Sequence, residues 1–145
     1  MSAPSPQLLE WGSKLQVQSI GLRYEVLRRP LGLFYTPEEL GEEVNQWHIG
    51  MVRGERVVAV LLLKKIDGNI AKMRQVAVAE ALQGKGIGND LVRFSEELCR
   101  REGIARIELH ARKTAVPFYH SLGYFSEGDE FEEVGIPHVK MFLQL

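Results

Sequence analysis

The strongest periodic pattern in the chain predicts an amphipathic helix that begins near residue 87 and ends before Gly103. Its apolar side chains, Ile87, Leu91, Phe94 and Leu98, recur at spacings of three or four residues and form one stripe. Gly103 stands where a left-handed residue commonly ends a helix. We therefore expect a surface helix that packs one face on a core.

The middle of the chain changes to runs of Val, Leu, Ile and Ala, which predict three successive antiparallel strands. We expect these strands at residues 47–53, 56–65 and about 70–79. Asp67-Gly68, between the last two, is typical of a two-residue hairpin turn with positive φ. The apolar run 57–63 lacks alternation, which predicts a strand that is covered on both faces.

Weaker patterns complete the outline on either side of these strands. We expect residues 1–12 to be a loose arm, 14–18 a short strand, and 19–29 a helix that Pro30 and Gly32 stop. The other predicted elements are a short helix at Pro37 capped by Thr36, a strand at 106–110, a helix capped by Thr114 and ended by Gly123, and a last strand at 138–145. This order predicts a mixed α/β domain with helices packed on a central sheet.

The composition fits one globular domain of 145 residues, with 45% hydrophobic and 26% charged side chains. The 18 Lys and Arg against 19 Asp and Glu give a net charge of -1, so we expect neither nucleic acid nor a membrane surface as the partner. No apolar run approaches the roughly 20 residues of a membrane helix. A lone cysteine, Cys99, and the lack of a secretory segment favour a cytoplasmic location.

The turn Gln83-Gly84-Lys85-Gly86-Ile87-Gly88 lies between a predicted strand and the predicted main helix. Free backbone N–H groups and the helix dipole favour an anion there, and glycine lets the backbone approach a phosphate closely. The turn fits neither a P-loop nor the G-x-G-x-x-G pattern. Taken alone, it predicts either a site for a pyrophosphate-like group or a flexible entry to the helix.

Three segments together resemble the GNAT superfamily of N-acetyltransferases. Gln83-x-x-Gly86-x-Gly88 is similar to the Q/R-x-x-G-x-G/A turn of the family, residues 74–78 to its bulged strand, and residues 115–124 to its A-x-x-F-Y-x-x-x-G-F/Y segment. The resemblance implies the GNAT fold, with a mixed, mostly antiparallel central sheet of about six to seven strands flanked by about four helices.

A narrower resemblance points to the ElaA-like branch of this superfamily. Residues 47–49, 109–111 and 131–141 carry it, and members of the branch often end in F-x-E-x-G-I-P-H-x-x-M. The branch has poorly defined substrates, so the resemblance narrows the subfamily more than the reaction.

The resemblance implies acetyl-CoA as the donor, with its pyrophosphate on the turn and its pantetheine arm along the bulged strand. Backbone N–H groups of that strand are suited to polarise the thioester carbonyl. Arg112 stands where many members carry Asn, and it either reaches the cofactor or is solvated. The expected donor-binding residues are Val76, Ala77, Val78, Gln83, Gly84, Lys85, Gly86, Ile87, Gly88, Arg112 and Phe118.

The resemblance also places Tyr119 near the CoA sulfur as the general acid. The ordinary pKa of tyrosine, about 10, leaves the hydroxyl protonated at neutral pH, so that it can donate. From periodicity alone, Tyr119 would be a core residue of an amphipathic helix.

The acceptor amine must lose a proton, and the candidates for this step or for substrate contact are His48, His110, Glu132 and His138. A strand histidine is more often a packed, hydrogen-bonded residue than a base, so the base stays unassigned. The sequence has no H-E-x-x-H motif or cysteine pair, and we expect no metal. Cys99 is expected to be a small buried hydrophobe.

These observations together predict an enzyme that moves the acetyl group of acetyl-CoA directly to a primary amine of a small molecule, in a ternary complex. Two alternatives stay open: a CoA-binding regulatory domain with weak catalysis, and an N-acetyltransferase for proteins or peptides. A homodimer through sheet edges or C-terminal segments is one candidate oligomeric state.

Overall fold

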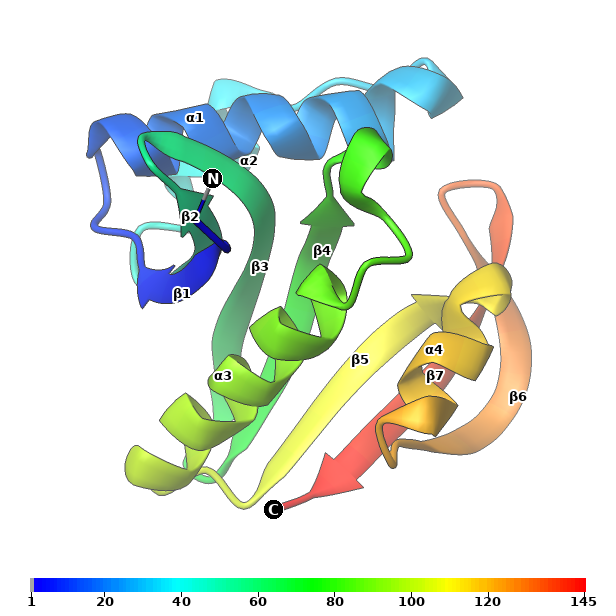
Figure 1. The fold of residues 1–145 in the computed structure, drawn as a ribbon. Helices are drawn as coiled ribbons and strands as arrows, with labels where there is room; N and C mark the ends of the chain where they lie inside the picture. Colours follow the sequence, from blue (N-terminus) through cyan, green and yellow to red (C-terminus); the bar gives the residue numbers. More distant parts are fainter. Residues whose placement is uncertain (1) are drawn as a thin grey trace.

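Seven strands form one sheet in the order β1-β2-β3-β4-β5-β7-β6 (Figure 1). The computed structural model describes residues 2–145. The strands are β1 (Ser5–Leu8), β2 (Trp47–Arg53), β3 (Arg56–Asp67), β4 (Ile70–Val78), β5 (Arg106–Arg112), β6 (Phe125–Glu133) and β7 (Ile136–Gln144). Neighbouring strands are antiparallel except β4 and β5, which are parallel.

The helical segments connect these strands and include one π-helical and three 3₁₀ turns. They are α1 (Lys14–Arg23), η1 (Tyr24–Arg28, π-helical), η2 (Arg29–Leu31), α2 (Pro37–Gly41), η3 (Glu80–Leu82), α3 (Ile87–Arg101), η4 (Lys113–Ala115) and α4 (Val116–Ser121). Helix α3 makes the crossover that the parallel pair β4–β5 requires. The expected mixed, mostly antiparallel sheet flanked by helices is confirmed.

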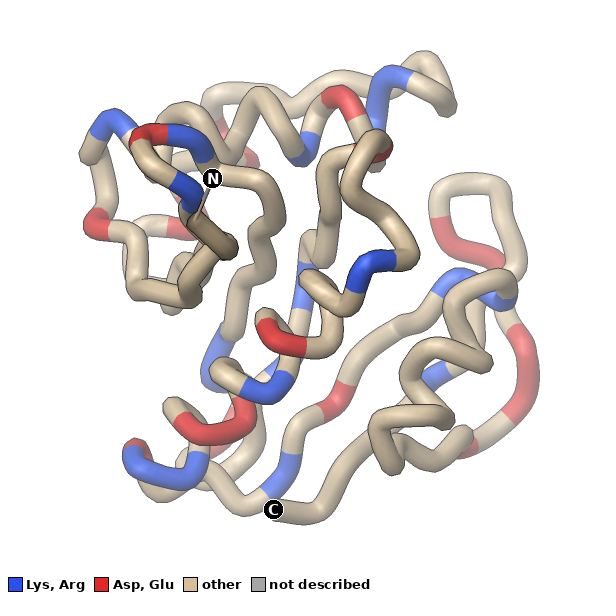
Figure 2. Tube along the Cα trace, viewed as in Figure 1, with Lys and Arg blue, Asp and Glu red and all other residues tan. Residues whose placement is uncertain are grey.

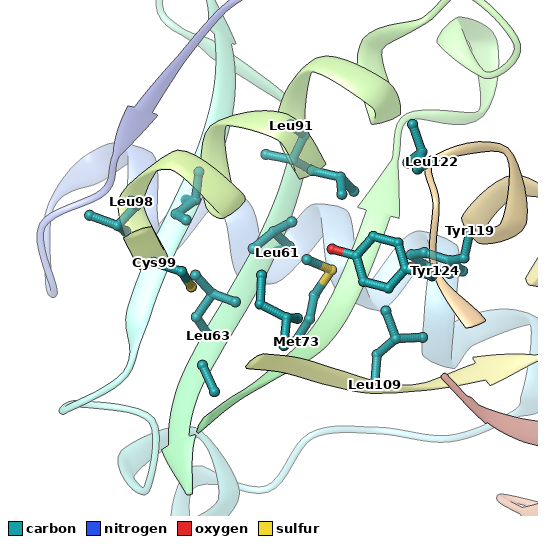
Figure 3. Close-up of a cluster of buried hydrophobic side chains, with 14 of the residues drawn as sticks. Leu61, Leu63, Met73, Leu91, Leu98, Cys99, Leu109, Tyr119, Leu122 and Tyr124 are labelled. Carbon is teal, nitrogen blue, oxygen red and sulfur yellow. The ribbon is translucent and has the colours of Figure 1, made fainter. Parts of the chain in front are cut away.

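Helices cover both faces of the sheet, and β3 supplies side chains to the clusters on both faces. Leu61 and Leu63 face the cluster beneath α3, which also holds Leu91, Leu98 and Met73 (Figure 3). Val60 and Leu62 point the other way, into a cluster covered by apolar side chains of α1 and η1. Every residue of the run 57–63 is buried, which confirms the prediction drawn from its missing alternation.

The N-terminal elements differ from the prediction. Residues 14–18 begin α1 rather than a strand, because the Ser13 hydroxyl accepts a hydrogen bond from the Gln16 N–H at 3.2 Å and caps the helix. The buried face of α1 carries the polar side chains of Gln16, Ser19 and Arg23, so hydrophobic periodicity does not mark this helix. The expected loose arm contains β1, which pairs with β2 through its backbone and leaves most of its side chains exposed.

Two predicted helix starts have different outcomes. Thr36 caps α2 through a capping box with Glu39, as expected. Thr114 does not cap a helix, because residues 113–115 tighten into η4 and α4 begins only at Val116. Pro117 lies in the first turn of α4, where no intrahelical donor is lost.

The β3–β4 hairpin forms where it is expected but with another turn geometry. Asp67 pairs with Ile70, so Gly68 and Asn69 make the turn, and neither of them has a positive φ. The predicted primed turn is therefore wrong. A register shift between Lys65 and Asp67 alters the approach of the strands to this turn.

Helix α3 matches its prediction in both bounds and burial. Gly103 adopts φ +78°, and the Ile104 N–H donates to the Cys99 carbonyl at 2.9 Å to close the helix. Cys99 is buried, and burial raises the pKa of its thiol to about 12, which suits a packing role. None of the helices in residues 2–145 is long and apolar enough to cross a membrane.

Candidate functional site

The parallel strands β4 and β5 pair over only part of their length and then diverge (Figure 1). Their register runs from Ile70↔Arg106 to Met73↔Leu109, whereas β4 continues to Val78 and β5 to Arg112. The backbone groups of residues 75–78 that face β5 therefore have no strand partner there. This edge is free to hydrogen bond an extended ligand.

A β-bulge at Gln75 marks the point of divergence. Leu62 pairs with Arg74 and Val60 with Ala77, so two residues of β4 oppose the single residue Leu61. Gln75 itself has φ +56°, which is uncommon for a residue with a side chain. The bulge redirects the rest of β4 away from β5, and the expected bulged strand is present.

A cavity of about 340 Å³ lies at this divergence. Met73 and Val76 of β4, Leu109 of β5 and Tyr119 of α4 line it. Arg28 of η1 and the β6–β7 hairpin complete its walls. The cavity thus joins elements from the two helical layers at the place where β4 and β5 separate.

The glycine-rich turn precedes α3, whose N-cap is Gly86. Gly84 and Gly86 have φ +78° and +82°, and a Cβ on either would meet no atom within 4 Å, so both face open space. Gly88 differs, because its Cβ would lie 3.3 Å from the Phe118 ring. The first-turn N–H groups of α3 have no side-chain cap, as an anion site requires.

Gln83, which is exposed, and Phe118, which is partly buried, each contact a neighbouring element of the protein. The Gln83 side-chain amide donates to the Val78 carbonyl at 3.1 Å and ties the turn to the end of β4. Phe118 packs on Gly88 and meets the Tyr119 ring edge-on at 5.0 Å. Both residues therefore fix the turn, β4 and α4 relative to one another.

Tyr119 lies at the boundary between the buried cluster and the cavity. Its side chain is 6% exposed, and its ring contacts that of Tyr124 at a centroid distance of 5.7 Å (Figure 3). Burial raises the pKa of the Tyr119 hydroxyl, so the group keeps its proton at neutral pH. Tyr124 differs from it, because its hydroxyl donates to the buried Glu96 carboxylate at 3.0 Å.

Across the cavity, one carboxylate lies between two histidines. Glu133 accepts a hydrogen bond from Nδ1 of His110 at 2.9 Å, and Nε2 of His138 lies 3.6 Å from its other oxygen. Desolvation opposes ionisation of Glu133, but the hydrogen bond from His110 and the charges of His110, His138 and Lys72 together lower the pKa of its carboxyl. An ionised Glu133 orients His110 so that its Nε2 is left to accept a proton.

Glu133 was missed by the sequence analysis, which named its neighbour Glu132. Glu132 is exposed and does not line the cavity. The two side chains point to opposite faces of β6. Because the register shifts between Glu127 and Phe131, the alternation of side chains along the strand does not predict which of the two faces the cavity. A signal was available, because the F-x-E-x-G-I-P-H pattern places its glutamate at position 133.

His48 lies apart from the cavity. It is buried on β2, where its Nε2 donates to the Glu43 carbonyl at 2.8 Å and its ring meets Trp11. Desolvation lowers its pKa, which keeps the ring neutral. The structure therefore brings His110 and His138 to the cavity and leaves His48 as a packed residue.

The hairpin that carries Glu133 has an unusual turn. Val134 and Gly135 both have positive φ, +48° and +78°, between the paired residues Glu133 and Ile136, which is the pattern of a type I′ turn. A β-branched residue rarely adopts this conformation. Val134 lines the cavity, so the strained residue lies directly at the site.

The segment between α1 and α2 braces the bulge. The Tyr35 hydroxyl donates to the Gln75 side chain, and the guanidinium groups of Arg23 and Arg28 lie 4.7 and 4.5 Å from the centre of the Tyr35 ring. Arg23 in turn makes a buried two-bond ion pair with Glu43, at 2.9 and 2.8 Å. None of these contacts was predicted from the sequence, because contacts between distant segments leave no local pattern.

Arg112 lines the cavity at the end of β5. Its guanidinium donates to the Leu27 carbonyl of η1 at 3.1 Å, so it links β5 to the helical layer on the opposite face. Within residues 2–145, no group of three or more His, Cys, Asp and Glu side chains could hold a metal ion.

Sequence comparison relates the chain to known proteins. The family described as the acetyltransferase (GNAT) domain matches residues 27–145. YyaT of Bacillus subtilis (strain 168) is 35% identical over 77 residues, which are 53% of this chain and 52% of YyaT. ElaA of Escherichia coli (strain K12) is 30% identical over 97 residues, which are 65% of this chain and 63% of ElaA. The matches thus span between half and two thirds of the length of these relatives.

Solved structures resemble the fold over nearly the whole chain. Escherichia coli ElaA aligns with a TM-score of 0.82 at 24% identity, covering 96% of this chain and 98% of that one. A protein of Lactobacillus plantarum aligns with a TM-score of 0.88 at 22% identity and 99% coverage of both chains. A GNAT family acetyltransferase of Elizabethkingia anophelis, solved with acetyl-CoA bound, has a TM-score of 0.77 at 13% identity and full coverage of both chains.

Proposed function

Since the chain belongs to the acetyltransferase (GNAT) family, we propose that it transfers the acetyl group of acetyl-CoA directly to a primary amine of a small molecule. The ElaA-like branch expected from the sequence agrees with the likeness to ElaA in both sequence and fold. The observation that carries the proposal is the cavity at the β4–β5 divergence, which has Tyr119 on one side and the Glu133–His110 pair on the other.

The donor fits the residues that surround this cavity. The uncapped N–H groups of the first α3 turn and the open glycines Gly84 and Gly86 suit a pyrophosphate. The unpaired edge of β4 at residues 76–78 suits the amide groups of a pantetheine arm. The acetyl-CoA bound to the Elizabethkingia anophelis neighbour supports this choice of donor. When bound, acetyl-CoA supplies an activated acetyl group as a thioester.

Different residues of the chain carry out the successive steps of the reaction. His110 accepts a proton from the acceptor ammonium through Nε2, while Glu133 holds its Nδ1–H. Backbone N–H groups of residues 76–78 polarise the thioester carbonyl as the amine nitrogen bonds to its carbon. The carbon–sulfur bond breaks, and Tyr119 gives its proton to the departing sulfur. The nitrogen gives up its second proton as it becomes an amide, and this proton returns through water to Tyr119; His110 loses the proton that it accepted to water.

The size of the cavity favours a small acceptor over a protein or peptide. About 340 Å³ is near the lower end of the volumes that small-molecule sites have. The presence of Tyr119 at the cavity favours a catalyst over a purely regulatory CoA-binding domain.

Thiol release from acetyl-CoA in the presence of a panel of amines tests the proposal. We expect amine-dependent release, and we expect Tyr119→Phe to lower kcat by about a hundredfold with acetyl-CoA affinity nearly unchanged. Tyr24→Phe is the matched control, since Tyr24 does not line the cavity and should keep full activity. The absence of saturable acetyl-CoA binding in calorimetry would refute the proposed donor.

A further inference from the structure

Like charges meet on the sheet face opposite α3, beside the cavity. Lys64 on β3 is the direct cross-strand partner of Lys72 on β4, and Arg74 follows two residues later on the same face of β4. Blue segments mark lysine and arginine on both of these strands in Figure 2. Like charges placed directly opposite each other destabilise a sheet. An anion bound between them would remove that repulsion.

Among residues 2–145, no carboxylate lies close enough to Lys72 to form an ion pair with it. The two carboxylates that act on it are engaged elsewhere, Glu108 with Arg106 and Glu133 with His110, each at 2.9 Å. Desolvation, together with the charges of Arg74 and Lys64, lowers the pKa of its ammonium group. Two cations and two carboxylates thus act on this half-buried amine, and both carboxylates already have another partner.

Lys72 stands where two cavities meet. It lines the cavity that holds Tyr119, and it lines a second cavity of about 380 Å³ over the same sheet face, which also shares Arg74 and His110. The first cavity has four cationic side chains in its walls, Arg28, Lys72, Arg74 and Arg112, against the single carboxylate of Glu133. The excess of positive charge is confined to the first cavity, because Glu39, Glu42, Glu43 and Glu108 line the second one together with Lys64, Lys72, Arg74 and Lys140.

We infer that the acceptor amine also carries an anionic group, a carboxylate or a phosphate, which binds at Lys72 beside Lys64 and Arg74. This inference rests on the proposed function, because it describes the other end of the molecule that His110 deprotonates. Lys72 lies four residues before Val76, with the Gln75 bulge between them. The amine and the anion are therefore separated by several bonds, as in an ω-amino acid rather than an α-amino acid.

Matched acceptors of equal length test this inference. Thiol release is measured with 5-aminopentanoate, 4-aminobutylphosphonate and pentylamine, which offer a carboxylate, a phosphonate and no anion. We expect a KM at least tenfold lower for one of the two anionic amines than for pentylamine, and the better of the two identifies the anion. Lys72→Gln should raise that KM about tenfold and leave the KM for pentylamine within about twofold.

Lys14→Gln is the matched control, because it removes the same charge from an exposed site on α1 that lines neither cavity. Equal KM values for all three amines, or an equal effect of Lys72→Gln on all three, would overturn the inference while leaving acetyl transfer intact.

If no amine gives thiol release, the proposed function fails instead. Calorimetric titration of the CoA complex with 5-aminopentanoate and 4-aminobutylphosphonate then decides the anion site, since binding that is independent of Lys72 refutes it.

Discussion

Nδ1 of His110 donates a hydrogen bond to the Glu133 carboxylate at 2.9 Å, and the two residues are 23 positions apart in the sequence. Glu133 is the last residue of β6, the edge strand, and β7 lies between this strand and β5, which holds the histidine. The pair faces Tyr119 across one cavity, so a base and an acid lie on opposite sides of the space that a reacting group would fill.

Glu133→Gln should lower kcat by about a hundredfold. The glutamine amide can still orient His110, but it does not stabilise the positive charge that His110 gains when it accepts a proton. The adjacent Glu132→Gln is the matched control, since that side chain is exposed and outside the cavity. Steady-state thiol release at saturating acetyl-CoA measures both. Equal losses in the two variants would show that the pair has no part in the chemistry.

The stability of the wild type relative to Glu133→Gln should depend on pH. The folded protein lowers the pKa of the Glu133 carboxyl, so the ionised group stabilises the fold above its unfolded pKa of about 4.3. That stabilisation is lost as the pH falls through the folded-state pKa. Thermal unfolding of both proteins between pH 7 and pH 3 should show a difference in Tm that disappears at the acid end; a constant difference would contradict the assignment.

Gly86→Ala should weaken acetyl-CoA binding by about tenfold. The added Cβ meets no protein atom, so the methyl group occupies space expected for the phosphate, while φ +82° lowers the stability of the turn by about 1 kcal/mol with or without the ligand. Gly68→Ala provides the control, because Gly68 is equally open and has no positive φ. Calorimetry with acetyl-CoA checks both. Unchanged affinity in a folded Gly86→Ala protein would remove the turn from the donor site.

Glu43→Gln should destabilise the fold by about 3–5 kcal/mol, because it leaves the buried Arg23 guanidinium without its counter-charge. Glu25→Gln breaks the exposed pair with Arg29 and should change the free energy of unfolding by less than about 1 kcal/mol. Urea titrations of the two variants give the comparison directly. Similar small losses would mean that solvent reaches Arg23.

Val134→Asn should stabilise the protein by about 1 kcal/mol, because asparagine tolerates the left-handed conformation that strains valine. Val44→Asn tests whether polarity alone has this effect, since Val44 is equally exposed and has no positive φ. A gain in both variants would assign the effect to surface polarity.

The sequence predicted the elements whose burial follows a simple period. Helix α3 has one apolar stripe, and β3 has none of the alternation of a half-buried strand, so both were predicted correctly. Helix α1 was misread because the side chains that it buries, Gln16, Ser19 and Arg23, are polar. Its burial depends on partners such as Glu43, which lies 20 residues away and adds no period to the helix itself.

The candidate site was predictable on the donor side and only partly on the acceptor side. The turn and Tyr119 belong to continuous segments with fixed spacing, whereas the Glu133–His110 pair depends on the register of β6 against β7 and of β7 against β5. A single-residue change of register exchanges Glu132 and Glu133 at the cavity. The hydrogen bond from Tyr35 to Gln75 joins residues 40 positions apart, so no local sequence pattern predicts it.

The burial of β3 on both faces has a consequence for how the molecule opens. The same strand supplies Leu61 to one cluster and Val60 to the other. If either helical layer detaches, it exposes one face of a strand whose opposite face packs against the remaining layer. The amide protons of β3 should therefore exchange with solvent only in the global unfolding event, and those of α1 and α3 that exchange slowest should approach the same rate. β1, at the edge of the sheet and with mostly exposed side chains, should exchange far earlier.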